Sequence, residues 1–233
     1  MKTLFVHVPR CGGMSFYYFL EEVFGKENSI RFGDNSTVSI FLESAIDYND
    51  FLCLSGHVPY PFFQARGCQK KRFTIAFVRD PKLRELSCFS HMRGNDYIDH
   101  LSIPTNTQTE YWKYFSFHAD LHNIQSSYFC EDRTHNGAKN SILENKLCVF
   151  DVEDIFLVAD IIKSFIGVEF MPAHTNGSDR EQLELSPAGV TSIEKFCAED
   201  IKLHTWVKNN RQFFLDQLKI ELWRNYLQSS EDD

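Results

Sequence analysis

A strand, a short glycine loop and a helix follow one another at the start of the chain, and this stretch constrains the fold more than any other. Four apolar residues between Leu4 and Val8 predict a short buried strand, and the Pro-Arg-Cys-Gly-Gly segment at 9–13 predicts a tight loop. A helix is expected from Met14, with Gly25 closing it. Backbone N–H groups at the start of a helix have no intrahelical partner, so this junction is a candidate phosphate site.

The residues of this loop, considered alone, allow two interpretations. Gly12 and Gly13 let the backbone approach an anion closely, and Arg10 and Ser15 add a charged donor and a hydroxyl. The loop lacks the G-x-x-x-x-G-K-[ST] spacing that makes a P-loop specific. An ordinary turn between a strand and a helix therefore explains the stretch equally well.

The length and composition suit one α/β domain with a full core. The 233 residues are 43% hydrophobic and include 22 phenylalanines, which is enough for one packed core and cramped for two. We expect this domain to span residues 1–228. The polar, acidic residues at 229–233 are expected to form a disordered tail.

Charge and cysteine usage narrow the function classes. The formal net charge of −8 argues against binding nucleic acid or anionic membrane through the overall field. No run approaches the roughly 18 to 20 apolar residues that a membrane span needs. The seven cysteines are scattered, odd in number and without a CxxC pair, so neither a disulfide framework nor a metal site is expected. A reducing cytoplasm fits these features best, and the oligomeric state stays open.

Later segments repeat the pattern of strand followed by helix. Residues 51–54 and 73–78 predict buried strands, and 146–150 predicts a third, followed by a helix over 152–166. Ser186 and the following proline open a helical C-terminal third. The expected fold class is therefore α/β, with a central, mostly parallel sheet flanked by helices.

Two residues around the 73–78 strand can serve an anion together. Arg79 follows the strand directly, and Ser87 lies eight residues further on in a helix that begins at Pro81. If that helix folds back along the sheet, both side chains reach one ligand. Spacing alone favours a purely structural interpretation, in which Arg79 pairs with Asp80 or a glutamate and Ser87 faces solvent.

Three separated segments together resemble the sulfotransferases that use 3′-phosphoadenosine 5′-phosphosulfate (PAPS), most closely the group that includes heparan sulfate 2-O-sulfotransferase and its bacterial relatives. FVHVPRCGGMSF at 5–16 looks like the family's 5′-phosphosulfate loop, often written I-P-K-T-G-G-T-S. SGHVPY at 55–60 is similar to the family's G-H segment, and FVRDPKLRELSCFSH at 77–91 resembles its 3′-phosphate motif. Each motif alone is weak, whereas their order and spacing are specific together.

The resemblance implies a P-loop-like domain and a set of site residues. His57 would act as the general base, and Arg10 would steady the leaving group. Arg79 and Ser87 would bind the 3′-phosphate, and Ser178 would close over the nucleotide. The residues expected around the 5′-phosphosulfate are Arg10, Cys11, Gly12, Gly13, Met14 and Ser15.

The implied reaction moves a sulfuryl group from PAPS to a hydroxyl or amine and releases adenosine 3′,5′-bisphosphate. Like phosphoryl transfer, it requires in-line positioning and stabilisation of the leaving group. The acceptor would be a carbohydrate, a lipid or a small molecule, and the acidic composition favours a neutral one. A basic groove that includes Lys70, Lys71 and Arg72 would instead favour a polyanionic glycan.

The chain departs from the family pattern at four positions. Arg10 stands where the family mostly has lysine, and Cys11 and Met14 replace hydroxyl residues. Ser55 stands where the closest members have a second histidine, so an arrangement of two histidines is not expected. Cys11, at a helix N-terminus, is expected to be the most reactive thiol. These departures keep two alternatives open: a nucleotide-binding module with impaired catalysis, and a small-molecule P-loop kinase.

Overall fold

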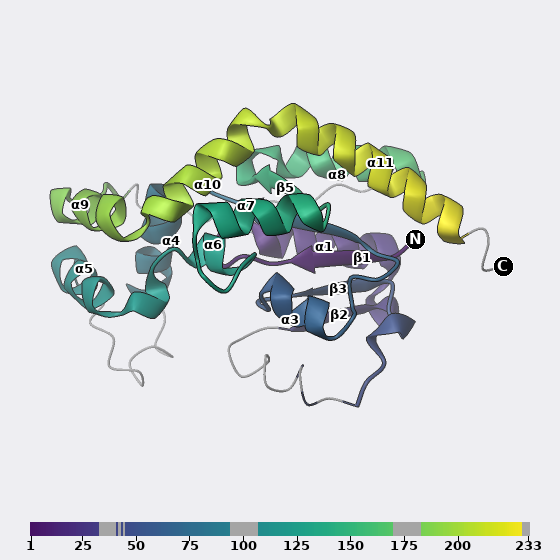
Figure 1. Ribbon diagram of the computed structural model, residues 1–233, viewed down its shortest axis with the longest axis horizontal. Coiled ribbons are helices and arrows are strands. Elements are labelled where there is room, and N and C mark those ends of the chain that lie inside the picture. Colours follow the sequence, from purple (N-terminus) through teal and green to yellow (C-terminus); the bar gives the residue numbers. More distant parts are fainter. Residues whose placement is uncertain (33–40, 42, 44, 94–106, 170–182, 230–233) are drawn as a thin grey trace.

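A five-stranded parallel sheet forms the centre of the protein (Figure 1). The computed structural model describes the chain except for residues 33–40, 42, 44, 94–106, 170–182 and 230–233. Every strand pairing in the described residues is parallel, and the strand order is β2-β3-β1-β4-β5. The strands are β1 (Thr3–Val6), β2 (Ser29–Phe32), β3 (Cys53–Gly56), β4 (Phe73–Val78) and β5 (Cys148–Asp151).

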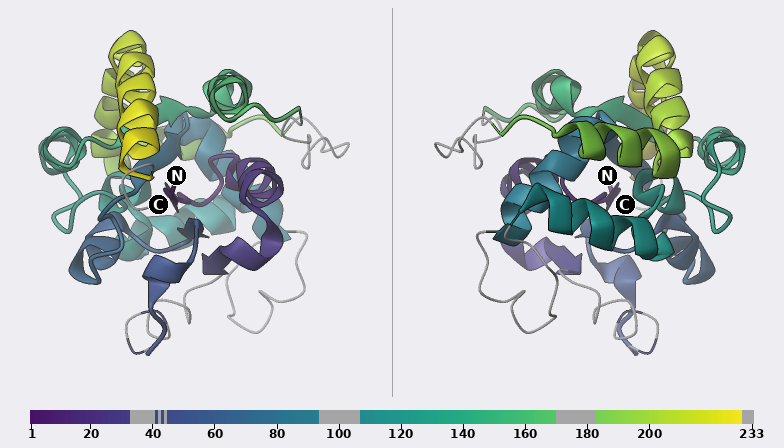
Figure 2. Two further views of the ribbon diagram at one scale, coloured as in Figure 1. Left: turned by 90° about the vertical axis from the view of Figure 1, so that its right-hand side faces the viewer. Right: turned by 90° about the vertical axis from the view of Figure 1, so that its left-hand side faces the viewer.

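Helices cover both faces of this sheet. Helices α1 and α8 lie on one face and α3 and α7 on the other, while α10 and α11 run along β5 (Figures 1 and 2). The described helices are α1 (Gly13–Phe24), α3 (Tyr60–Ala65), α4 (Pro81–Arg93), α5 (Gln108–Phe117), α6 (Ile124–Ser127), α7 (His135–Glu144), α8 (Ile155–Ile166), α9 (Pro187–Phe196), α10 (Ala198–Asn209) and α11 (Arg211–Ser229).

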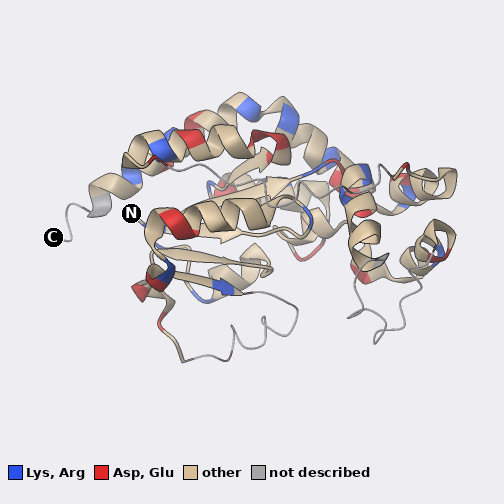
Figure 3. Cartoon of the chain, turned by 180° about the vertical axis from the view of Figure 1, so that it is seen from behind, with Lys and Arg blue, Asp and Glu red and all other residues tan. Residues whose placement is uncertain are grey.

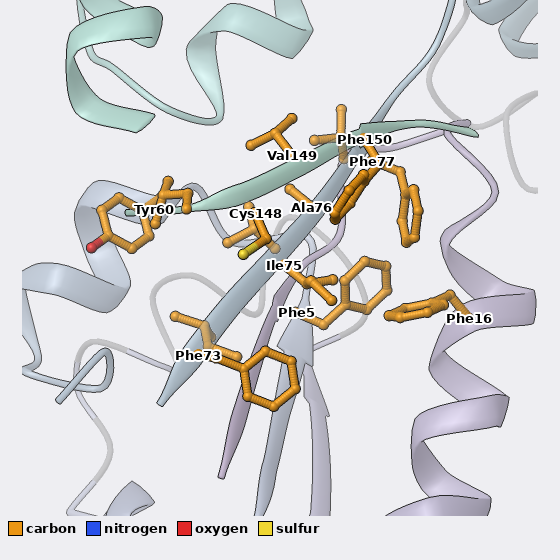
Figure 4. Close-up of a cluster of buried hydrophobic side chains, with 14 of the residues drawn as sticks. Phe5, Phe16, Tyr60, Phe73, Ile75, Ala76, Phe77, Cys148, Val149 and Phe150 are labelled. Carbon is orange, nitrogen blue, oxygen red and sulfur yellow. The ribbon is translucent and has the colours of Figure 1, made fainter. Parts of the chain in front are cut away.

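Aromatic side chains lock α1 onto the two strands beside the first loop. Phe16 of α1 packs edge-to-face against Phe5 of β1 and Phe77 of β4, with ring centroids 5.1 and 4.8 Å apart (Figure 4). All three side chains are buried, and burial of one such side chain stabilises the fold by about 1.5–3 kcal/mol. The start of α1 is therefore held at a fixed position over the end of β1.

A second apolar cluster extends the fold beyond the sheet. Phe89 of α4, Tyr111 and Phe115 of α5 and Ile193 of α9 are buried against one another. In Figure 1 these three helices lie together to one side of the strands. They form a wall beyond the carboxyl ends of β1 and β4, where the predicted motifs lie.

The strand order creates a crevice at the ends of β1 and β4. The chain leaves β1 toward β2 at one side of the sheet and leaves β4 toward β5 at the other. Adjacent parallel strands whose connections diverge in this way leave an opening at their carboxyl ends, the usual ligand position in open α/β sheets. The first loop, Arg79 after β4 and His57 after β3 all lie at this edge.

Several ion pairs lie along the outer helices. On the face seen in Figure 3, basic and acidic residues are interspersed along α10 and α11. Lys208 contacts Glu153 at 3.2 Å, and Arg211 contacts Asp154 at 2.7 Å. Such exposed pairs contribute little to stability, and the positive charge discussed below lies elsewhere, at the crevice.

The predicted fold class is confirmed: α/β, with a parallel sheet flanked by helices and a helical C-terminal third. The strand predicted at 73–78 is β4, and Gly25 and Gly167 end α1 and α8 with φ of 86° and 80°. The strand predicted at 51–54 lies at 53–56 instead. Strand β2 was not predicted, and the proposed tail falls largely outside the described residues. No helix within the described ranges combines the length and apolar character needed to cross a membrane.

Candidate functional site

The loop after β1 forms the floor of the crevice. Arg10 and Gly12 both adopt left-handed backbone conformations, with φ of 66° and 74°, which turn the chain sharply into α1. An ideal Cβ on Gly13 would lie 1.8 Å from the His7 ring, and one on Gly12 would lie 2.5 Å from Ile155. Only glycine fits at either position, because the loop backbone packs directly against His7 at Gly13 and against Ile155 at Gly12.

The N-terminus of α1 opens into the crevice. Its N-cap is Gly12, which has no side chain that could accept a hydrogen bond from the first-turn N–H groups. Helix N-termini attract anions because the first backbone N–H groups lack partners and the helix dipole adds positive charge. Met14 and Ser15 of the first turn line the adjoining cavity.

The two predicted phosphate motifs are joined by direct hydrogen bonds. The Nε and Nη2 atoms of Arg10 donate to Ser87 Oγ over 3.2 and 3.0 Å. Arg79 Nη1 donates to the Arg10 carbonyl over 3.3 Å. Asp80 accepts the backbone N–H groups of Lys82 and Leu83, so it caps α4. Helix α4 packs beyond the carboxyl ends of the strands and not back along the sheet (Figure 1), and it still brings Ser87 beside the loop.

A buried glutamine fixes the position of Arg79. The Gln125 side chain accepts from the Arg79 amide over 2.7 Å and donates to the Arg79 carbonyl over 2.8 Å. The buried Asp200 carboxylate in turn accepts hydrogen bonds from the backbone N–H of Gln125 and from the backbone N–H and side-chain hydroxyl of Ser126. Burial raises the pKa of the Asp200 carboxyl above its ordinary value, although these hydrogen bonds oppose the shift.

Gln125 and Asp200 are site residues that the sequence interpretation did not assign. Gln125 lies outside the three motifs, and Asp200 lies in a helix with no motif around it. A buried residue that holds another residue leaves no distinctive pattern, because its partner is distant in sequence.

The expectation of a reactive Cys11 is wrong. Its side chain is 1% exposed and contacts Gln125 Oε1 at 3.5 Å. Burial raises the pKa of the Cys11 thiol to about 12, despite the opposing effect of Arg84 and Arg79. The helix N-terminus does not lower it, because the thiol points into the core and away from the crevice. Cys11 therefore contributes its backbone to the loop and its side chain to packing.

His57 presents a hydrogen-bond acceptor to the crevice. Its Nδ1 lies 2.9 Å from the backbone carbonyl of His7. A carbonyl only accepts hydrogen bonds, so Nδ1 is the donor in this contact, and Nε2 is the ring nitrogen that can accept a proton when the ring is neutral. His57 lines the cavity, and this tautomer is the one that a general base requires.

A second histidine lies beside His57, contrary to expectation. The ring of His7 is 4.1 Å from that of His57, centroid to centroid, and both line the cavity. Burial, with smaller effects from His57, Arg31 and Arg10, holds the pKa of His7 well below its ordinary value. His7 is therefore neutral near pH 7. The prediction considered only position 55, whereas the residue directly after the neighbouring strand β1 supplies the second ring.

One large cavity connects these groups. It has a volume of about 1080 Å³ and is lined by the loop, by His57, Arg79 and Ser87, and by apolar residues from several helices. Arg84 also lines it, but this buried guanidinium is ion-paired with Glu85. The cavity thus combines a cationic, donor-rich part with an apolar part that includes Pro59, Phe62, Leu121, Ile124 and Tyr128.

The basic segment at 70–72 does not belong to this cavity. Arg72 precedes β4 at the opposite edge of the sheet and is 6% exposed. Its guanidinium donates to backbone carbonyls of residues 3, 48, 51 and 52. Arg72 therefore ties the amino-terminal ends of the strands together, and its side chain is not available to a basic acceptor groove with Lys70 and Lys71.

The structure brings most of the predicted site residues together. Arg10, Gly12, Gly13, Met14, Ser15, His57, Arg79 and Ser87 all line the cavity, and Cys11 lies just behind it. Ser178 lies outside the described residues. A scan against models of known protein families and a search of curated proteins find no match to this chain. The resemblance to PAPS-dependent sulfotransferases therefore stays a prediction that depends on the three motifs.

Proposed function

We propose that the protein is a PAPS-dependent sulfotransferase. One observation carries the proposal: three motifs from distant parts of the sequence converge on a single cavity, in which Arg10 of the first motif bonds Ser87 of the third. The shared cavity places a helix N-terminus, two arginines and a hydroxyl around one space. These groups are all hydrogen-bond donors, which is the chemistry that a nucleotide with two phosphate groups needs.

The loop and α1 are proposed to bind the 5′-phosphosulfate. Gly12 and Gly13 bring backbone N–H groups close to the ligand, and Ser15 adds a hydroxyl from the first helical turn. Arg79 and Ser87 are proposed to bind the 3′-phosphate. The clamp that Gln125 forms on the Arg79 backbone supports this assignment, since it holds the base of that side chain rigidly.

His57 is proposed to remove the proton of the acceptor. PAPS supplies the activated sulfuryl group, and adenosine 3′,5′-bisphosphate is the leaving product. The lone pair on His57 Nε2 accepts the hydroxyl proton, and the Nδ1 bond to the His7 carbonyl keeps the ring in the required tautomer. Stabilisation of the leaving group by preorganised donors supplies much of the remaining rate enhancement.

The acceptor is proposed to be a hydroxyl-bearing molecule with an uncharged body, such as a neutral glycan, a lipid or a small metabolite. Pro59 and Phe62 follow His57 and line the same cavity. The basic segment that would favour a polyanionic glycan lies at the opposite edge of the sheet. Apolar lining with a few polar groups is typical of pockets for small organic molecules.

Transfer of labelled sulfate from PAPS tests the proposal. We expect label to appear in at least one member of a panel of phenols, sterols, aliphatic alcohols and neutral sugars, without a requirement for magnesium. Heparan sulfate is expected to be a poor acceptor in the same panel. Tight binding of the product nucleotide with no transfer to any acceptor, including heparan sulfate, would instead indicate a binding module.

A further inference from the structure

The side chain of Arg10 points toward the third motif. Arg10 lies in the left-handed region of backbone space, which is costly for a residue with a Cβ. Two of its guanidinium nitrogens, Nε and Nη2, donate to the same hydroxyl of Ser87. Backbone and side chain thus direct the positive charge toward α4, although residue 10 belongs to the loop that leads into α1.

Arg79 lies against the same residue. Its Nη1 donates to the Arg10 carbonyl over 3.3 Å, so its guanidinium lies beside the loop, and both arginines line the cavity. Ser87 Oγ accepts two N–H groups from Arg10, which leaves the hydroxyl hydrogen of Ser87 as a donor to a ligand. Two arginines and one hydroxyl therefore converge where the 3′-phosphate is proposed to bind.

The chemistry of arginine fits this place better than that of lysine. A planar guanidinium can contact Ser87 with two nitrogens and still present N–H groups to phosphate oxygens, whereas an ammonium is a single compact charge. The substitution of arginine for the lysine typical of the family therefore changes more than the strength of one contact. It also allows the side chain to bond Ser87 of the third motif through two nitrogens.

We propose that Arg10 is a specificity residue for the 3′-phosphate of the nucleotide, where it acts together with Arg79 and Ser87. This inference rests on the proposed function and revises one part of it, the role in leaving-group stabilisation that the resemblance implies for Arg10. That role then falls to the backbone N–H groups at the start of α1. The protein discriminates nucleotides with a 3′-phosphate from those without one through two arginines.

Two nucleotides that differ only at the 3′ position test this inference. Adenosine 3′,5′-bisphosphate is titrated by calorimetry, and adenosine 5′-monophosphate by ligand-observed NMR, into the wild type and Arg10→Met. We expect the variant to bind the bisphosphate about ten- to a hundredfold more weakly, the effect of losing charge-assisted hydrogen bonds. Binding of the monophosphate is expected to change less than about threefold, a loss smaller than that of one such bond.

Three further variants make the result specific. Arg10→Lys keeps the charge and should recover only part of the discrimination between the two nucleotides. Ser87→Ala should also lower the discrimination between the two nucleotides, because it removes the hydroxyl that the Arg10 guanidinium bonds. Lys82→Met removes one positive charge from α4 at an exposed residue paired with Glu194, outside the cavity lining. This control should bind both nucleotides as the wild type does.

The outcomes separate this inference from the proposed function. Equal weakening of both nucleotides by Arg10→Met would place Arg10 at the shared 5′-phosphate and overturn the inference, with the function intact. No change in either nucleotide would overturn it as well. A wild-type protein that binds neither nucleotide at millimolar concentration would remove the proposed function, and the inference with it.

Discussion

Replacing His57 with alanine is expected to slow sulfuryl transfer by about 10²- to 10⁴-fold, the usual contribution of a general base. Binding of adenosine 3′,5′-bisphosphate should be nearly unchanged, because the imidazole is proposed to contact the acceptor and not the nucleotide. The expected signature is therefore a loss of kcat with an intact nucleotide affinity. Transfer of labelled sulfate gives the first quantity, and calorimetry gives the second.

A histidine outside the cavity provides the control. His118 ends α5, and its Nδ1 lies 2.8 Å from the Tyr114 carbonyl, so its role is local. The His118→Ala variant should keep both transfer and nucleotide binding. If His57→Ala transferred sulfate at the wild-type rate, His57 would not be the base, and the neighbouring His7 would be the next residue to replace.

The Gly13→Ala variant is expected to lose nucleotide affinity by about ten- to a hundredfold, the effect of losing a charge-assisted hydrogen bond from the displaced loop. The added methyl group would lie 1.8 Å from His7 Cδ2 and 2.0 Å from His7 Nε2. His7 cannot move aside easily, because its buried ring packs between Phe5 and His57. The loop must therefore shift, and overpacking should also destabilise the protein by about 1–3 kcal/mol.

Gly167→Ala separates these two effects. This glycine ends α8 with φ of 80°, and an added Cβ would meet no atom within 4 Å. The control should lose about 1–2 kcal/mol of unfolding free energy from the backbone conformation alone, yet keep its nucleotide affinity. Chemical denaturation measures the stability of both variants. Wild-type nucleotide affinity in Gly13→Ala would show that the loop is not the binding site.

Local signals in the sequence predicted most of the sheet and several helix boundaries. Strand β4 was predicted with its observed bounds, since six consecutive apolar or β-branched residues are followed by an N-cap and a proline. Strand β2 was missed because it is a short edge strand, only partly buried, with the exposed Arg31 in its centre. Edge strands lack the continuous apolar pattern of central ones.

The candidate site was predictable where its residues lie in motifs, and not where they meet across the fold. The contact between Arg10 and Ser87 joins residues 77 positions apart, and nothing in either motif specifies it. The same holds for Gln125, which reaches Arg79 from 46 positions away. Such contacts depend on how α4 and α6 pack beyond the sheet, which local patterns do not encode.

Calorimetric titration with adenosine 3′,5′-bisphosphate tests the central claim most directly, because it requires no knowledge of the acceptor. We expect saturable binding of one nucleotide per chain at micromolar concentration, with no binding of ATP and magnesium at the same concentrations. Binding of magnesium-ATP in place of the bisphosphate would contradict it and indicate a kinase. Absence of bisphosphate binding at millimolar concentration would contradict it outright.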